Sequence, residues 1–494
     1  MKTKVPPAAI ATLKLAEESA TARLAEDVAA AARAGDIILL EGGLGAGKTS
    51  FARAFLRALA GDAQLEVPSP SFAMRIDYAM PRFAVTHADL YRLADPAEAE
   101  EVGLLDLSPQ TLLLAEWPER GELDAEEALT IRLEVDGCGR SASICGGGDW
   151  PERLARSFLI RRFLDKSRRA RSHRMPILGD ASGRSYERVR GGADAVLMNA
   201  PARQQGPPVW HGKSYDAVAH RALDLSAFLT VRELLAAKGA RVPEVYAQDL
   251  AAGLLLVEDF GAEPILTPDN RPILARYEAA VDLLLKLHRP HPKDAAARAA
   301  LSAYDTQALL IETSLFADHF AAQEAKRPFS AAQREDFLAT WRELLGPLQG
   351  GERVIVLRDF HSPNIIWLEG AAGTDRVGVI DFQDALIGHP AYDLASLAQD
   401  ARADIAEAEE EALLRRYVAA RQKAEPGFDE EALRRAYAIL AAQRASKVLG
   451  AFARLARAGM PTYRAHMPRL RARLRRDLNK PVLSPLRRCY QNLL

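Results

Sequence analysis

The sequence predicts two domains of different fold class, an α/β domain followed by an α+β domain. The chain has 494 residues, more than one hydrophobic core usually organises. Helical and strand-like stretches alternate over the first 150 residues, which is typical of a parallel or mixed sheet with helices packed on it. From residue 177 onward short strands come first, and beyond Pro272 the chain is mostly helical. This order predicts a small strand-rich lobe followed by a larger helical lobe.

The elements of the first domain flank a glycine-rich turn. The predicted helices are 17–33 and 48–60, and the predicted strands are 37–40, 82–85, 111–115 and 128–135. In the second domain the apolar runs predict strands within 177–198 and at 253–259, 354–357 and 377–380, and a helix at 224–238.

The domain boundary is predicted in the segment 137–148 (GCGRSASICGGG), which is small, glycine-rich and without periodicity. The first domain is therefore assigned to 1–148 and the second to 149–494. Within the second, the small lobe is placed at about 151–260 and the helical lobe at about 261–494. A linker of this composition predicts a flexible tether that requires no coupling between the domains.

A basic run, 166–174 (KSRRARSHR), follows a helix predicted at 151–165. Such runs are usually solvated connections, and docking to RNA or to the other domain is the alternative. The formal net charge of the whole chain is −1, which gives it no general attraction to nucleic acid or to an anionic membrane. The run is therefore interpreted as a solvated linker.

The composition is that of an ordinary globular protein, with 48% hydrophobic and 27% charged residues. Cys138, Cys145 and Cys489 are too few and too scattered for a disulfide framework or a closed zinc site. The N-terminal residues lack the apolar core of a secretory signal, and no run of about 18 apolar residues follows, so we expect no membrane span. A cytoplasmic location is expected.

The turn after the first predicted strand has the complete P-loop pattern, GGLGAGKT at 42–49. Glycines let successive backbone N–H groups turn toward phosphates, and the helix that follows directs its positive dipole end at the same anion. The lysine reaches the outer phosphates and the threonine hydroxyl is suited to Mg²⁺. The first domain is therefore an α/β P-loop NTPase domain. Its expected nucleotide-binding residues are Gly42, Gly43, Gly45, Ala46, Gly47, Lys48 and Thr49.

A magnesium site at this turn needs an acidic residue at the end of a neighbouring strand. Asp89 and Glu116 both follow apolar strand-like runs and are the candidates, together with Thr49. Each carboxylate could instead cap a helix or be solvated.

Three further segments accompany the turn: VPSPSF at 67–72, HADLYRL at 87–93 and EWPE at 116–119. With GGLGAGKT they resemble the TsaE (YjeE) family over about residues 10–140. That family is a bacterial ATPase assisting tRNA threonylcarbamoyladenosine synthesis. The resemblance implies ATP and Mg²⁺ as cofactors, threonylcarbamoyl-transferase complex subunits as partners and tRNA only as an indirect one. It also implies that Glu116 has a catalytic role, that Ser71 replaces the usual Thr of a switch-like segment, and that Trp117 lies near the nucleotide.

A second site is predicted at 357–384, where LRDFHSPN is followed by an apolar strand ending in DFQD. Phosphoryl transfer needs one carboxylate to orient the acceptor hydroxyl and accept its proton, and a second carboxylate with an amide oxygen to hold Mg²⁺. Asp359 fits the first role, whereas Asn364 and Asp381 fit the second. The alternative, that Asp359 and Asn364 only stabilise a turn, does not explain Asp381 at the strand end.

The small lobe carries the expected nucleotide contacts of this second site. GDASGRSYERV at 179–189 occupies the place of a phosphate-covering hairpin, with Ser182 and Arg184 as candidate ligands. LLLVEDF at 254–260 leads into the expected hinge, which makes Glu258 the candidate beside the adenine.

These segments, with AVLMNAP and HPAYDLASLAQDAR, resemble the aminoglycoside phosphotransferase-like superfamily over about 151–480, and most of all the sugar kinase AmgK. The resemblance implies a protein-kinase-like α+β fold and ATP-dependent phosphorylation of the anomeric hydroxyl of N-acetylmuramate or N-acetylglucosamine. The strand lysine of the wider kinase pattern is Met198 here, so either another cation binds the phosphates or ATP binding is weaker. Arg184 and Arg190 are the candidate cations, and the alternative is that they are solvated surface charges.

Other interpretations of the second domain remain open at this point. The acceptor could be an aminoglycoside, choline, homoserine or another alcohol, and a non-catalytic regulator of the ATPase is a further alternative. Asp393 is expected to brace the catalytic loop, and His361 to be a packing residue of that loop.

Overall fold

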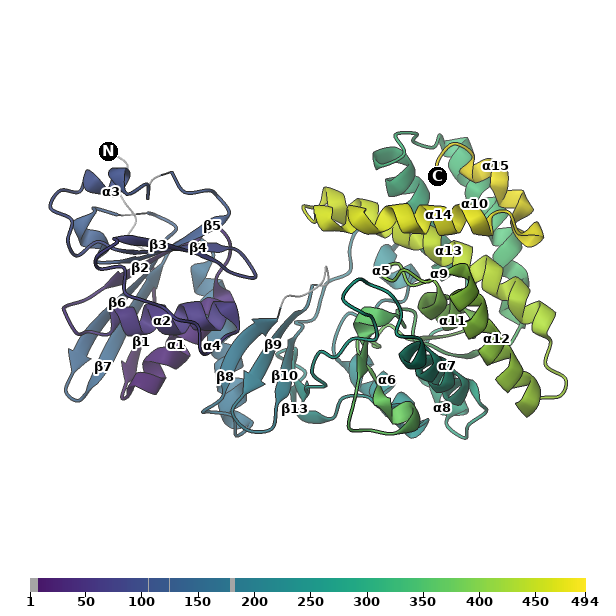
Figure 1. Cartoon of the computed structure of the whole chain (residues 1–494), viewed down its shortest axis with the longest axis horizontal. Helices are drawn as coiled ribbons and strands as arrows, with labels where there is room; N and C mark the ends of the chain where they lie inside the picture. The colour runs from purple at the N-terminus through teal and green to yellow at the C-terminus, as the bar shows by residue number, and fades with distance from the viewer. Residues whose placement is uncertain (1–7, 105, 124, 178–182) are drawn as a thin grey trace. The chain divides into compact units, whose positions relative to one another are not determined.

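The computed structural model describes residues 8–104, 106–123, 125–177 and 183–494, and divides into two compact units (Figure 1). The first unit runs to Ala200 and includes Val245–Asp259, and the second consists of Pro201–Glu244 and Phe260–Leu494. No helix in the described part of the chain is long and apolar enough to cross a membrane. The small-lobe sheet thus belongs to the same compact unit as the N-terminal domain. The boundary at 148/149 stays a prediction.

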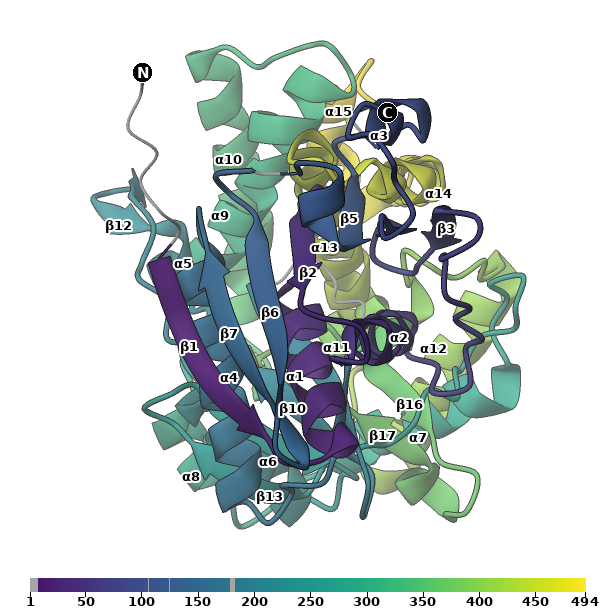
Figure 2. The ribbon, with the colours of Figure 1, turned by 90° about the vertical axis from the view of Figure 1, so that its left-hand side faces the viewer.

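A seven-stranded mixed sheet forms the centre of the N-terminal domain. Its strand order is β1-β7-β6-β2-β5-β4-β3, and β2, β4, β5 and β6 are parallel to one another. Figure 2 shows β1, β7, β6, β2 and β5 side by side in this order. The strands are β1 (Ala8–Leu15), β2 (Ile37–Glu41), β3 (Arg75–Ala79), β4 (Ala84–Asp89), β5 (Thr111–Glu116), β6 (Leu129–Asp136) and β7 (Gly139–Gly146).

Both faces of this sheet are covered, which explains its uninterrupted apolar strands. Ile38 and Leu40 of β2 pack in a core with helices α1 (Glu18–Ala31) and α2 (Lys48–Ala60), whereas Leu39 packs in a separate core on the other face. The predicted helix 48–60 is confirmed at both ends. The short helix α3 (Glu98–Glu101) contributes its buried Ala99 to the second core.

The prediction that 137–148 is an irregular linker is wrong, because most of the segment forms strand β7. This strand pairs with β1 on one side and with β6 on the other. Ala142 and Ile144 are buried, whereas Ser143 between them is exposed. The period-two pattern of a strand is therefore present, but it is short and its side chains are small.

The helix predicted at 151–165 is present as α4 (Trp150–Lys166), which leads into a second sheet. The second sheet is antiparallel, with the order β13-β14-β10-β9-β8. Its strands are β8 (His173–Ile177), β9 (Ser185–Arg190), β10 (Ala195–Asn199), β13 (Val245–Asp249) and β14 (Leu254–Glu258). Arg174, the last residue of the basic run, is 1% exposed in β8. The interpretation of that run as a solvated linker is wrong for this residue.

The second unit is mostly helical, as the sequence beyond Pro272 predicts. Its helices are α5 (Tyr215–Val218), α6 (Ser226–Ala237), α7 (Leu274–His288), α8 (Asp294–Ala300), α9 (Thr306–Leu315), α10 (Ala331–Leu345), α11 (Ala391–Ala398), α12 (Glu407–Ala424), α13 (Glu430–Arg457), α14 (Met467–Asp477) and α15 (Arg487–Tyr490). Three two-stranded sheets accompany them: β11 (Pro208–Trp210) with β12 (Lys213–Ser214), β15 (Val354–Val356) with β18 (Leu386–Gly388), and β16 (Ile365–Trp367) with β17 (Val377–Val379).

Candidate active sites

The glycine-rich turn lies between the end of β2 and the start of α2, the context that a phosphate-binding loop requires. Gly42 has φ +135° and Gly47 has φ +104°, conformations that residues with a Cβ rarely adopt. A Cβ on Gly42 would lie 2.1 Å from the Leu133 carbonyl oxygen, and one on Gly47 would lie 2.8 Å from Arg140 Nε. Both positions therefore require glycine.

Lys48 lies folded over this turn. Its Nζ donates to the carbonyl oxygens of Gly42 (2.6 Å) and Gly43 (2.9 Å) and is 3.5 Å from the centroid of the Trp117 ring. Burial lowers the pKa of Lys48, and the carboxylates of Glu116 and its neighbours oppose this shift. The ammonium is thus held at the loop by two carbonyl groups that phosphate oxygens can replace.

The two predicted carboxylates meet at one edge of the sheet. Asp89 is the last residue of β4 and Glu116 the last of β5, and the two are register partners in the parallel pair. The Thr49 hydroxyl donates to Glu116 (2.8 Å), and the Ser71 hydroxyl donates to Asp89 (2.6 Å). Two hydrogen-bonded pairs, Thr49 with Glu116 and Ser71 with Asp89, are therefore brought together by the pairing of β4 with β5.

These side chains fit Mg²⁺, which prefers oxygen ligands. The predicted ligands combine the hydroxyl of Thr49 with the carboxylates of Asp89 and Glu116. Among the described residues, no three His, Cys, Asp or Glu side chains form a metal cage by themselves. Mg²⁺ here would take further ligands from phosphate oxygens and water, as is usual for this ion.

Two residues near the turn have no role in the sequence-based prediction. His87 Nε2 lies 3.0 Å from Glu116 Oε1 and is fully buried. It precedes Asp89 by two residues in one strand, so the period-two pattern could have placed both on one face. Arg140 lies against Gly47, and its buried Nε has no hydrogen-bond partner among the described residues. Its strand was not predicted, so no signal placed it there.

In the second unit, the three predicted side chains of the phosphoryl-transfer site belong to connected segments. Asp359 follows β15, Asn364 ends the turn η4 (Ser362–Asn364), and Asp381 follows β17. The Asn364 side chain donates to the Asp359 carbonyl (2.9 Å), and the Ile380 N–H donates to the Asn364 carbonyl (3.0 Å). Asp381 has φ +56°, and Gln383 Nε2 donates to its carboxylate (2.8 Å).

Two buried carboxylates fix the loop that carries Asp359. Asp393 accepts the N–H groups of Leu357 (2.6 Å) and Arg358 (3.0 Å), which confirms its predicted bracing role. Burial raises the pKa of Asp393 to about 7. Asp400 accepts the Ser362 N–H (2.8 Å) further along the same loop.

His361 lies in the same loop and is 7% exposed. Burial lowers the pKa of His361 to about 4, so the imidazole is neutral near pH 7. Its buried position agrees with the expected packing role.

Cations behind the loop keep Asp359 ionised. Burial alone would raise the pKa of Asp359, but the cations Lys447 and Arg444 hold it well below its usual value. Lys447 Nζ lies 3.1 Å from Glu312, which also pairs with the buried Arg358. A carboxylate with so low a pKa is suited to orient a hydroxyl and to receive its proton only as phosphoryl transfer proceeds.

The small-lobe candidates lie in the first unit. Ser182 falls outside the described residues. Arg184 precedes β9, and Glu258 ends β14. Met198 is 4% exposed in β10 and is the register partner of Tyr186 and Leu255.

The register also separates the two candidate replacements for the missing lysine. Arg190 is at the far end of β9 from the partner of Met198, and it forms ion pairs with Asp194 and Asp259. Arg184 lies beyond the near end of the strand. Arg184 is therefore closer along the chain to the partner of Met198 than Arg190 is, and its role stays a prediction.

Comparison with known families agrees with this arrangement. Residues 173–435, more than half of the chain, match the family model described as "Phosphotransferase enzyme family" (APH). The chain belongs to the phosphotransferase enzyme family. Residues 15–142 match the model described as "Threonylcarbamoyl adenosine biosynthesis protein TsaE". The chain is therefore a fusion of a TsaE domain with a phosphotransferase, and it combines an ATPase family with a family that transfers phosphate to alcohols.

Curated relatives match each half separately. The phosphotransferase half is 35% identical over 330 residues to the N-acetylmuramate/N-acetylglucosamine kinase of Caulobacter vibrioides, covering 63% of this chain and 88% of that kinase. It is 34% identical over 319 residues to the kinase of the same name from Pseudomonas putida, covering 62% and 84%. The TsaE domain is 40% identical over 84 residues to tRNA threonylcarbamoyladenosine biosynthesis protein TsaE of Rickettsia bellii, covering 17% of this chain and 58% of that protein.

Proposed function

We propose that the phosphotransferase domain transfers the γ-phosphoryl group of ATP to the anomeric hydroxyl of N-acetylmuramate or N-acetylglucosamine, and that the TsaE domain hydrolyses ATP in support of tRNA threonylcarbamoylation. The Caulobacter and Pseudomonas relatives support the first substrate class, and the Rickettsia relative supports the second role. Both reactions are assigned to the cytoplasm.

The observation that carries the kinase proposal is the hydrogen-bonded connection between the Asp359 loop, Asn364 and the strand before Asp381. Asp359 orients the acceptor hydroxyl and receives its proton as the new P–O bond forms. Asn364 and Asp381 would hold Mg²⁺, which when bound neutralises charge on the phosphates. Phosphoryl transfer depends mostly on positioning and charge, and this fixed loop supplies both.

In the TsaE domain, the glycine-rich turn and Lys48 hold the phosphates. Thr49 and Asp89 would hold Mg²⁺ with Glu116, which also orients the attacking water. Ser71 is hydrogen-bonded to Asp89, so its segment can respond to the ligand at that carboxylate. Trp117 covers Lys48 beside the nucleotide.

The kinase proposal is tested with the full chain, ATP and N-acetylmuramate, and the product is identified by mass and phosphorus NMR. The expected product is the anomeric phosphate, with N-acetylglucosamine also accepted. Aminoglycosides, choline and homoserine are tested in parallel. Phosphorylation of one of these alone would overturn the amino-sugar assignment, and no phosphorylation of any acceptor would favour a regulatory domain.

The TsaE proposal is tested by measuring ATP hydrolysis alone and with the threonylcarbamoyl-transferase subunits of the same organism. Hydrolysis should require Lys48 and increase when the subunits are added. Hydrolysis that is unchanged in Lys48→Ala would show that the P-loop is not the site.

A further inference from the structure

Helix α4 belongs to two hydrophobic cores at once. Trp150 and Leu154, in its first half, are buried in the core of the seven-stranded sheet. Ile160, Phe163 and Leu164, in its second half, are buried against the five-stranded sheet of the kinase small lobe. Its proline is at the first turn, where it does not interrupt the helix. The ATPase domain and the small lobe are thus joined by a packed helix.

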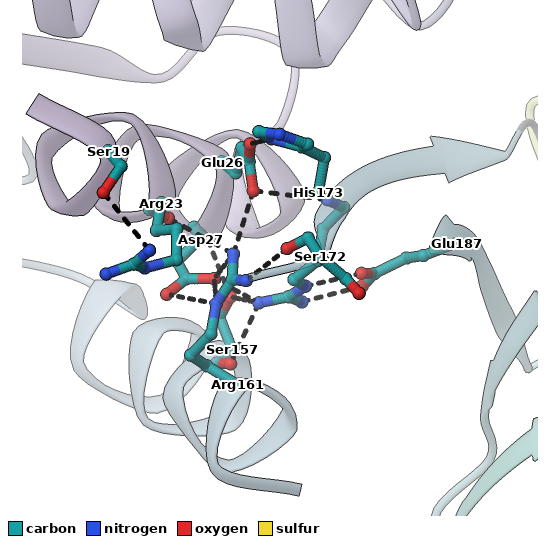
Figure 3. Close-up of polar contacts among 10 residues, drawn as sticks. Ser19, Arg23, Glu26, Asp27, Ser157, Arg161, Ser172, His173 and Glu187 are labelled. Carbon is teal, nitrogen blue, oxygen red and sulfur yellow. Dashed lines mark hydrogen bonds and ion pairs between the residues drawn. The ribbon is translucent and has the colours of Figure 1, made fainter. Parts of the chain in front are cut away.

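A buried ion network connects helix α1 of the ATPase domain to the small lobe (Figure 3). Arg174 of β8 donates to Asp27 of α1 at 2.5 Å and to both oxygens of Glu187 in β9 at 2.7 and 2.8 Å. The exposed fractions of these three residues are 1%, 4% and 5%. Arg174 therefore has one carboxylate partner in each domain.

Further contacts complete the network around α1. Arg161 of α4 donates to Asp27 (3.0 Å), to Glu26 (3.0 Å) and to the Ser172 carbonyl (3.0 Å). Figure 3 shows Glu26 and Asp27 of α1 facing Arg161 and His173. His173 Nδ1 lies 2.6 Å from Glu26. The side chains of α1, α4 and β8 thus satisfy one another's charges.

Such a network is specific for its partner. A buried charge is tolerated when it is paired and hydrogen-bonded, and removing one member leaves the others uncompensated. Glu26 and Asp27 are adjacent, buried acids on α1, and their cations come from residues more than 130 positions away. This face of α1 is therefore complementary to the small lobe.

The network ends on two strands of the small lobe. Arg174 lies on β8 and Glu187 lies on β9, which follows β8 in the sequence and pairs with it. Arg156 of α4 donates to the Asn199 side chain (2.6 Å), which in turn donates to Ser185 at the start of β9 (2.9 Å). Met198 cannot bind phosphates as a lysine would. Phosphate binding therefore depends more strongly on the position of the neighbouring strands β8 and β9.

We propose that the Glu26–Asp27 face of α1 is an internal docking surface for the kinase small lobe, and that the ATPase domain positions strands β8 and β9 through Arg174. This inference rests on the proposed kinase function for its rate measurements. Asp27 and Arg174 are positioning residues that do not contact the reactants.

The test is Asp27→Asn in the full chain, which keeps the shape of the side chain and removes its charge. The expected result is a KM of the kinase for ATP raised about 10-fold, because displaced β8 and β9 strands would hold the small-lobe nucleotide contacts less well. The KM for the amino sugar should stay unchanged, and Asp27→Glu should recover part of the effect. Arg162→Gln, an exposed arginine next to Arg161, is the matched control and should change neither constant.

A merely structural role gives a different result. Partial misfolding would lower kcat because fewer molecules are active, and it would leave the KM for ATP unchanged. That outcome would overturn the proposal.

Hydrogen exchange provides a readout independent of activity. The amides of 185–199 should exchange faster in Asp27→Asn, whereas those of α7 should not. Unchanged exchange in 185–199 would also overturn the proposal. If the wild-type chain phosphorylates no amino sugar, the proposed substrate is wrong. The hydrogen-exchange experiment still tests whether the small lobe is positioned by α1.

Discussion

The two phosphate sites of this chain are built from different parts of the polypeptide. In the TsaE domain the binding surface is main chain, shaped by Gly42 and Gly47 and followed by the start of α2. In the phosphotransferase domain the proposed site consists of the side chains of Asp359, Asn364 and Asp381, and Asp393 fixes the loop that carries Asp359. A main-chain site depends on conformation, whereas a side-chain site depends on its supporting carboxylates and cations.

This difference predicts how each site fails. Gly42 and Gly47 leave no room for a Cβ, so the turn is sensitive to small substitutions at these two positions. The second site should be most sensitive at the few side chains that act on the reactants. Substitutions that impair one site and leave the other active therefore test this difference.

The largest effect is expected for Asp359→Asn. Loss of the carboxylate should lower the kinase rate about 100- to 10,000-fold, the usual contribution of a general base. Hydrolysis by the TsaE domain should not change. Sugar phosphate formation is the measurement, and Asp375→Asn, an exposed carboxylate of the same unit, is the control. A rate within about twofold of wild type would contradict the assignment of Asp359.

Acid should destabilise the phosphotransferase half through its buried histidines, among them His389, whose pKa burial lowers to about 4. Burial lowers the pKa of His288 to about 3 and of His361 to about 4. Below about pH 6.5 the unfolded chain binds protons that these groups in the folded chain do not, so stability falls as the pH drops toward 4. The slope is up to about 1.4 kcal/mol per pH unit for each histidine.

Urea unfolding between pH 7 and pH 4.5 measures this slope. His361→Gln should make the slope smaller by the contribution of one histidine, because His288 and His389 remain. A slope in His361→Gln equal to that of the wild type would contradict the burial of the His361 imidazole in neutral form.

Lys48→Ala should remove one of two nucleotide-binding events seen by calorimetry with a non-hydrolysable ATP analogue. Charge-assisted hydrogen bonds of about 1.5–3 kcal/mol correspond to an affinity loss of about 10- to 100-fold. Lys14→Ala, an exposed lysine of β1, is the control. Two unchanged binding events would show that this lysine does not contact phosphate.

Arg140→Gln should weaken the same binding event about 3- to 10-fold, because the guanidinium lies beside Gly47 at the phosphate turn. Arg132→Gln provides the comparison, since this more exposed arginine of β6 pairs with Glu41. Equal effects of the two substitutions would exclude a specific contact from Arg140.

The smallest effect concerns the cation that replaces the kinase lysine. Arg184→Gln should raise the KM of the kinase for ATP about threefold or more, whereas Arg190→Gln should change it less than about twofold, since Arg190 is already paired with Asp194 and Asp259. The reverse order would assign the role to Arg190.

The fold could be predicted from the sequence wherever a local pattern of residues determines the structure. The α2 helix, the P-loop turn and the strand-end carboxylates Asp89 and Glu116 follow from periodicity and motif. The strand β7 was missed because glycine and small side chains conceal its alternation. The burial of Arg174 was missed for another reason: its partner Asp27 is 147 positions away, and no local pattern contains such a pairing.

The candidate sites show the same limit. Asp359, Asn364 and Asp381 are adjacent to predicted strands, so their connection could be anticipated. The cation Lys447, which helps to keep Asp359 ionised, comes from the long helix α13 and carries no motif. Its position depends on how that helix packs, which the local sequence does not encode.

Helix α4 also has a consequence for the cell. A cut within this helix would separate apolar side chains such as Trp150 and Phe163 from their cores, so the helix itself should resist proteases. Because both domains belong to one polypeptide, they are synthesised in a one-to-one ratio.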